Sequence, residues 1–116
     1  YIELQRHEVE AEKWVEPALL ELAAKLELPI VATNDVYFAT QGLYEAHDAL
    51  LCIAEGRYIS ETDRRRVTPE HYFKSQEDMA ELFADLPEAI ENTVAIAKRC
   101  SVMSPKRDPI LPRFGE

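Results

Sequence analysis

The sequence has little of what most phosphate-binding and metal-binding motifs need. Its 116 residues include only three glycines, too few for a Gly-rich phosphate loop. No H-E-x-x-H, C-x-x-C or Ser/His/Asp arrangement occurs, and no carboxylate pair of the two-metal type follows a recognisable strand. These absences exclude the commonest signatures of nucleotide-binding loops, zinc hydrolases and two-metal nucleases.

Cysteines and long apolar runs are also scarce. Cys52 and Cys100 fall on helical patterns without metal-type spacing, so we expect two buried free thiols in a reducing compartment. No apolar run approaches the ~18 residues that a membrane span needs, and no signal peptide is visible. The formal net charge of -9 argues against the chain as a whole being a nucleic-acid footprint, and indicates solubility instead.

Two short segments have the pattern of strands. Tyr1–Gln5 alternates polar and apolar residues, and Ile30–Ala32 is an apolar run that follows Pro29. A helix over Ala11–Glu27 between them predicts a strand–helix–strand unit with a parallel, buried second strand. In such sheets ligands bind at the carboxyl ends of strands, so Asn34 and Asp35 are the only candidate site that the residue pattern supplies.

The remaining patterns predict helices. In the first helix, Pro17 suggests that the main part begins at Glu16. A second helix is expected over Leu43–Glu55, with Gly56 in the position after its end. Two more helices follow, the first opened by a capping box at Ser75 and the second by Leu86-Pro87, and they form a helical hairpin. The expected core-facing side chains are Val15, Leu19, Leu22, Ala23 and Leu26, then Leu43, His47, Leu50 and Ala54, then Met79, Leu82 and Phe83, and last Ile90, Val94 and Ala97.

Three polar features allow two interpretations each. His7 at a strand end is a ligand or base, or simply a surface residue, and the pattern favours the surface. His47 is a catalytic partner of Asp48 or a hydrogen-bonded core histidine, and its apolar stripe favours the core. The run Arg64-Arg65-Arg66 meets phosphate or an acidic partner, or lies in a solvated loop, and the solvated loop is the favoured interpretation.

The chain has no initiating Met and closes on a Pro-rich tail, so we expect a segment of a larger protein. Four runs of residues, the last of them with a continuation, resemble a known family in the same order along the chain and over nearly its whole length. They are Tyr1–His7, Val31–Val36, Ala46–Cys52, Met79–Ala89 and Asn92–Cys100. Taken together, these runs resemble the alpha subunit of bacterial replicative DNA polymerase III, the family of DNA-directed DNA polymerases that add deoxynucleotides to a primer.

The resemblance implies an α/β fragment, mostly helical. Residues 1–56 would be the closing strand–helix–strand part of a PHP domain, a distorted seven-stranded barrel named after polymerase and histidinol phosphatase. Residues 57–100 would be a helical extension toward the polymerase palm, and 101–116 a Pro-rich linker. The polymerase carboxylates and their Mg²⁺ would lie outside this chain, so the resemblance implies no catalytic residue and no cofactor here.

The resemblance also assigns one vestigial metal ligand. Metal-binding PHP domains end their last strand in Asn-Asp-x-His, and this chain keeps the acid as Asp35 but has Tyr37 in the histidine position. A phenol with a pKa near ~10 is a poor ligand at neutral pH, so the site is expected to be degenerate. The alternative function is an active PHP metal-dependent phosphoesterase or proofreading exonuclease domain, and a third is a pure interaction module.

The implied partners follow from the same family. They are the rest of the polymerase alpha chain, the proofreading exonuclease subunit, other replisome subunits, and primer–template DNA through the parent protein. The implied location is the cytoplasm, with no membrane contact. Two strands without neighbours expose sheet edges, so the isolated chain is also expected to self-associate.

Overall fold

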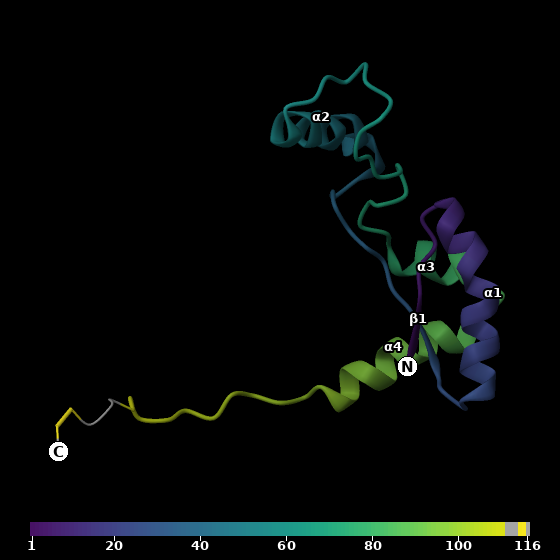
Figure 1. Ribbon diagram of the computed structural model, residues 1–116. Coiled ribbons are helices and arrows are strands. Elements are labelled where there is room, and N and C mark those ends of the chain that lie inside the picture. Colours follow the sequence, from purple (N-terminus) through teal and green to yellow (C-terminus); the bar gives the residue numbers. More distant parts are fainter. Residues whose placement is uncertain (111–113, 116) are drawn as a thin grey trace.

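The computed structural model describes residues 1–110, 114 and 115 (Figure 1). Residues 111–113 and 116, where part of the expected linker falls, lie outside the described residues. The fold is mixed α/β, as expected. In chain order the elements are β1 (Ile2–Leu4), α1 (Glu10–Lys25), β2 (Ile30–Ala32), a short 3-10 helix η1 (Gln41–Leu43), α2 (Tyr44–Glu55), α3 (Gln76–Leu82) and α4 (Pro87–Arg99).

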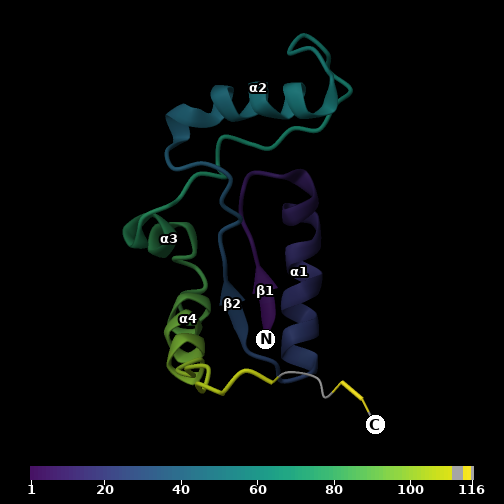
Figure 2. The same ribbon diagram turned by 90° about the vertical axis from the view of Figure 1, so that its left-hand side faces the viewer.

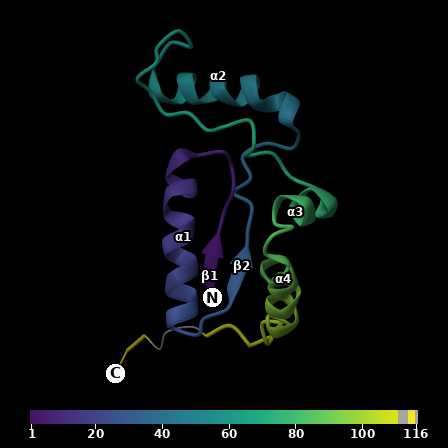
Figure 3. The same cartoon turned by 90° about the vertical axis from the view of Figure 1, so that its right-hand side faces the viewer.

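The two strands form a parallel sheet, as the pattern predicts. Ile2 pairs with Ile30 and Leu4 with Ala32, so these four side chains share one face of the sheet. The sheet lies between α1, beside β1, and α4, beside β2 (Figures 2 and 3). Membership of these strands in a larger seven-stranded barrel remains a prediction.

The hydrophobic core joins the sheet to the helical hairpin. Its fully buried members include Leu4, Phe83 and Ala89, with exposed fractions of 1%, 0% and 0%. Met79 and Leu82 of α3 pack against it, as predicted for that helix. The hairpin therefore lies directly on the sheet, while the proposed boundaries at residues 56 and 100 remain predictions.

The apolar faces of three helices are covered less than the pattern predicts. In α1, Ala23 is buried, but Val15, Leu22 and Leu26 are 41–54% exposed. In α4 the buried side is formed by Ala89 and Ile90, and Val94 is 53% exposed. In the predicted stripe of α2, Leu43, Leu50 and Ala54 are exposed and only His47 is half-buried, while the buried residues of the helix are Asp48 and Cys52. Periodicity alone therefore predicted too much burial.

Local signals predicted the helix ends well. Ser75 and Asp78 form the predicted capping box, and Gly56 has φ +64° after α2, as a left-handed terminus requires. The predicted break near Pro17 is wrong, because α1 is continuous from Glu10 to Lys25. Pro17 lies on the exposed side of α1, where water can satisfy the carbonyl that loses its partner. Thr68 opens a single hydrogen-bonded turn, in which the N–H of His71 donates to the carbonyl of Thr68.

The molecule is elongated. Its radius of gyration is 20.2 Å, against about 13 Å for a compact chain of this length. α2 stands beyond the carboxyl ends of the strands, and residues 101–110 extend away without helix or strand (Figures 1 and 3). None of the helices in the described residues combines the length and the apolarity that crossing a bilayer requires.

Candidate functional site

Three segments of the chain meet where the two strands end. Residues 5–7 continue from β1, residues 33–35 continue from β2, and residues 68–72 lie against both. The Thr68 hydroxyl donates to the carbonyl of His7 over 2.5 Å, and the Asn34 side-chain amide donates to the carbonyl of Tyr72 over 2.9 Å. The sequence predicted this place, because Asn34 and Asp35 do lie at the strand ends.

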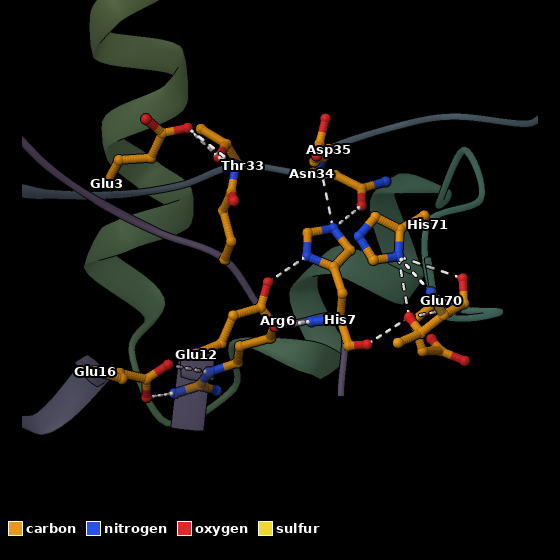
Figure 4. Close-up of polar contacts among 12 residues, drawn as sticks. Glu3, Arg6, His7, Glu12, Glu16, Thr33, Asn34, Asp35, Glu70 and His71 are labelled. Atoms are coloured by element: carbon orange, nitrogen blue, oxygen red, sulfur yellow. Dashed lines mark hydrogen bonds and ion pairs between the residues drawn. The ribbon is translucent and has the colours of Figure 1, made fainter. Parts of the chain in front are cut away.

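His7 is buried at the centre of this junction, with an exposed fraction of 1%. The prediction that it lies on the surface is therefore wrong. Glu8, which follows it, has φ +60° and turns the chain from β1 into α1. This turn brings Glu12 back over His7, where the carboxylate accepts from the backbone N–H of His7 at 2.5 Å and lies 2.8 Å from ring Nδ1 (Figure 4).

Both ring nitrogens of His7 have polar neighbours. Nδ1 faces the carboxylate of Glu12, which can only accept, so Nδ1 donates to it. Nε2 lies 3.1 Å from the backbone nitrogen of Asp35 and 3.0 Å from Oδ1 of Asn34. One of these neighbours donates and the other accepts, so Nε2 contacts the segment after β2 in either tautomer.

A second histidine stacks on the first. The rings of His7 and His71 are 4.2 Å apart at 19°, and His71 is 7% exposed. The backbone N–H of Thr68 donates to Nδ1 of His71 over 3.2 Å. Burial, and next the neighbouring His7, lower the pKa of His71. We call His7, Glu12, Asn34, Thr68 and His71 the histidine junction.

Glu12 is the anion of the histidine junction. Burial of its carboxylate raises its pKa, but the hydrogen bonds from the backbone and the ring of His7 outweigh this effect and hold the pKa below its usual value. Glu12 therefore stays ionised against the Nδ1–H of His7. With both ring nitrogens engaged, His7 joins segments of the chain and is not available as a general base.

Asp35 and Tyr37 lie outside this network. Asp35 is exposed, and its carboxylate points away from the two imidazole rings (Figure 4). Tyr37 is 39% exposed and lies edge-on to His71 at 5.5 Å between ring centroids. Within residues 1–110, 114 and 115, no three His, Cys, Asp or Glu side chains are grouped to hold a metal ion. The metal role of Asp35 and the substitution at Tyr37 remain predictions.

A hollow of about 390 Å³ lies beside the junction. Its polar lining comes from Arg6, Lys13 and four glutamates, Glu8, Glu12, Glu16 and Glu70. The guanidinium of Arg6 pairs with Glu16 at 2.5 Å and with Asp85 at 2.6 Å, and it lies over the ring of Phe83. Three of these four carboxylates already contact a basic side chain: Glu12 contacts His7, Glu16 contacts Arg6, and Glu70 contacts Lys74.

His47 is only partly the core histidine that the pattern predicts. Its ring lies 5.4 Å from the rings of both Tyr37 and Phe38. Its Nδ1 is buried, however, and has no hydrogen-bond partner among the described residues. Its contacts hold the start of α2 against the strand-end loop.

The arginine run is not simply a solvated loop. Two nitrogens of Arg64 each lie 2.6 Å from an oxygen of Asp48, and the two side chains are 1% and 8% exposed. This bidentate pair lowers the pKa of Asp48, with burial acting in the opposite direction. Arg66 lies 3.6 Å from the same carboxylate, whereas Arg65 is exposed. Sequence reasoning missed this pair because no local signal links positions 48 and 64.

The cysteines differ from each other. Cys52 is buried, as predicted, but Cys100 is exposed at the end of α4. Both are free thiols. The prediction of burial for Cys100 is wrong because the last turn of α4 extends past the sheet.

Comparison with known proteins gives a consistent result. The chain is 58% identical over 114 residues to the DNA polymerase III subunit alpha of Caulobacter vibrioides, a match that covers 98% of the chain. It is 45% identical to the same subunit of Rickettsia bellii and 44% identical to that of Pseudomonas aeruginosa, each over 115 residues and nearly the whole chain. The chain is homologous to a segment of DNA polymerase III alpha subunits. No protein-family model matches it.

The match covers only part of each relative. The chain spans about 10% of the length of these DNA polymerase III alpha subunits. Within that segment the alignment runs from end to end, through the strands, the histidine junction, α2 and the hairpin. This agrees with the colinear resemblance that the sequence indicated.

Proposed function

We propose that this chain is the closing part of the PHP domain of a replicative DNA polymerase III alpha subunit and the start of its connection to the palm. The observation that carries the proposal is 58% identity over 98% of the chain to such a subunit. The parent protein then acts as a DNA-directed DNA polymerase in the cytoplasm, and this segment contributes framework without a catalytic residue. Polymerase chemistry and its Mg²⁺ belong to residues outside the chain.

The geometry supports a framework role for the strand ends. His7, the residue best suited to acid–base chemistry by type, is engaged at both ring nitrogens. Asp35 supplies one exposed carboxylate, and Tyr37 supplies a phenol in place of an imidazole ligand. These residues alone do not fit a metal cluster, so the proposal routes no reaction through a metal here.

The polymerase assignment is tested on the complete subunit and on this chain. The complete subunit should extend a primed template with deoxynucleotides in Mg²⁺. The 116-residue chain should show no incorporation above background under the same conditions. Lack of incorporation by the complete subunit, or incorporation by the chain alone, would overturn the assignment.

The alternative is an active PHP phosphoesterase, and Asp35 is the residue that favours it. Calorimetric titration of the intact PHP domain with Mn²⁺ and Zn²⁺ separates the two functions. A degenerate site gives no tight multi-site binding, and Asp35→Asn leaves the titration unchanged. Tight binding that Asp35→Asn weakens would establish the phosphoesterase alternative.

The partners proposed from the family are the remainder of the alpha chain, the proofreading exonuclease subunit, other replisome subunits and, through the parent protein, DNA. The structure refines how the arginine run is tested. Charge reversal at Arg64 would break the buried pair with Asp48, so its effect on binding would be indirect. Arg65→Glu changes an exposed charge only, and lost capture of the exonuclease subunit by this variant would assign the run to that contact.

A further inference from the structure

Helix α2 turns its apolar side to solvent. Leu50 is 62% exposed and Ile53 77% exposed, and with Leu43 and Ala46 they recur at the spacing of one helical face. Asp48 and Cys52, on the opposite face, are each 5% exposed. A helix that buries a carboxylate and leaves leucine and isoleucine in solvent departs from the usual arrangement of an amphipathic surface helix.

The ion pair between Asp48 and Arg64 fixes this orientation. Its two contacts of 2.6 Å join the inward face of α2 to residues that follow the helix. Rotating α2 by half a turn would bury the apolar residues, but it would also separate Asp48 from Arg64. Removing one partner from a buried pair is strongly unfavourable. The outward apolar face is therefore specified by the fold.

The apolar surface continues past the end of the helix. Tyr58 and Ile59 are 76% and 65% exposed, and with Ile53 they line a hollow of about 650 Å³. α2 stands away from the sheet and the other helices (Figures 1 and 3). We define the α2 stripe as Leu43, Ala46, Leu50, Ile53, Tyr58 and Ile59. None of its members is charged.

We propose that the α2 stripe is the docking surface for an apolar segment, with helical or extended backbone, from the remainder of the same polymerase polypeptide. The proposal rests on the proposed function. The relatives are roughly ten times longer than this chain, which covers 10% of each, so most of such a polypeptide is available to cover the stripe. A covalently attached segment is present at high effective concentration from the moment of synthesis.

The chemistry of the stripe favours permanent cover over a separable partner. Interfaces that form and dissociate are about as polar as the rest of a protein surface, whereas permanent ones resemble a divided hydrophobic core. A stripe of aliphatic and aromatic side chains without charge belongs to the second class. Left open on a free subunit, a contiguous apolar patch would promote aggregation.

Cysteine labelling of the complete polymerase subunit tests the proposal. Ile53→Cys places a thiol on the stripe, and Glu55→Cys places a matched thiol about 160° away around the same helix. Each variant carries Cys100→Ser, and peptide mass spectrometry follows modification by a maleimide at the new site. The rates are compared in the native subunit alone, in the presence of the exonuclease subunit, and in denaturant.

In the subunit alone, the thiol of the Ile53→Cys variant should react on the order of tenfold or more slowly than that of the Glu55→Cys variant, because labelling on the stripe then requires local opening. The difference should vanish in denaturant. Equal native rates would overturn the proposal, as would protection that appears only when the exonuclease subunit is added. Primer extension by the same preparations shows whether a negative result concerns the docking of the stripe or the polymerase assignment itself. A subunit that extends primers but labels equally at both sites refutes only the docking of the stripe.

Discussion

His7 joins three segments because each of its polar atoms has a partner on a different one. Its N–H and Nδ1 contact Glu12 on α1, its Nε2 contacts residues after β2, and its carbonyl accepts from Thr68 before α3. A phenylalanine in its place would preserve the stacked ring and lose the ring's polar bonds.

We expect His7→Phe to lower the free energy of unfolding by about 2 kcal/mol, because Glu12 and the N–H of Asp35 lose a partner in a buried position. Urea unfolding followed by circular dichroism measures the change. Lys13→Ala is the matched control, since Lys13 pairs with the exposed Glu10 at the surface and should matter little. Equal stability of the two variants would show that the polar bonds of the ring are not stabilising.

His71 should make the fold sensitive to mild acid. Burial and then His7 hold its pKa below the ordinary value of 6.5, and the hydrogen bond to the Thr68 backbone, followed by the charges of Asp35 and Glu12, opposes this only in part. As pH falls, the unfolded chain takes up the proton first, so stability declines from about 6.5 downward. The carboxylates with lowered pKa, including Glu12 and Asp48, reduce stability only in a separate pH range, below about 4.5.

His71→Phe should therefore flatten the decline of stability between pH 7.5 and 5.5, while it keeps a ring stacked on His7. Denaturant midpoints at several pH values measure the slope. An unchanged slope in the variant would assign the sensitivity to another group.

Asp48→Asn should destabilise the chain far more than Arg65→Glu. The amide cannot neutralise the guanidinium of Arg64, which is 1% exposed, whereas Arg65 changes an exposed charge. Thermal unfolding of both variants gives the comparison. Similar midpoints would mean that the pair is replaceable and does not fix the orientation of α2.

At the scale of elements, α1 and α2 end in the same way but with different residues. In both, a left-handed residue allows a backbone N–H beyond the helix to close the last turn: Leu28 donates to the carbonyl of Ala23 in α1, and Arg57 donates to that of Cys52 in α2. The left-handed residue is Glu27 at φ +53° in α1 and Gly56 at φ +64° in α2.

Glu27→Gly should stabilise the chain by about 1 kcal/mol, because glycine adopts this backbone without the penalty that a side chain carries. Gly56→Ala should destabilise it by a similar amount, and nothing lies within 4 Å of the added Cβ, so the effect is conformational. Chemical unfolding of the pair gives opposite signs if this account is right. A loss of stability in Glu27→Gly would point to an uncounted contact of the glutamate.

The elements were predictable from sequence because their signals are local. The apolar run Ile30–Ala32, the capping box at Ser75 and Gly56 each act within a few residues of themselves. The outward face of α2 and the burial of His7 were not predictable, because both depend on partners far along the chain. Asp48 contacts Arg64, and His7 contacts Asn34. Both pairs are separated in sequence by far more residues than one helical or strand repeat. The position of the candidate site at the strand ends was predictable, and its contacts were not.

At the scale of the whole molecule, the sheet has one open edge and one covered edge. Ile2 donates to Pro29 and Leu4 accepts from Thr33, so by alternation the N–H and carbonyl of Glu3 face away from β2. On the other side, α4 packs along β2, and the amide of Asn92 donates to the carbonyl of Ile30 over 2.8 Å.

Self-association of the isolated chain should therefore proceed through β1. Glu3→Pro removes the outward N–H and leaves the bonds to β2 in place, so it should suppress association without unfolding the chain. Light scattering over a concentration series measures association, and circular dichroism confirms folding. Unchanged association in a folded Glu3→Pro variant would place the contact elsewhere, with the α2 stripe as the next candidate.

The contact of Asn92 with β2 also limits how many copies of the chain can associate by strand pairing. A chain that offered pairing groups on both sides could add copies without end, as in a fibre. Here each copy has a single strand to contribute, so two copies that join through β1 leave no further strand edge for a third. Growth through backbone pairing should stop at a dimer, which light scattering would register as a plateau at twice the mass of the chain.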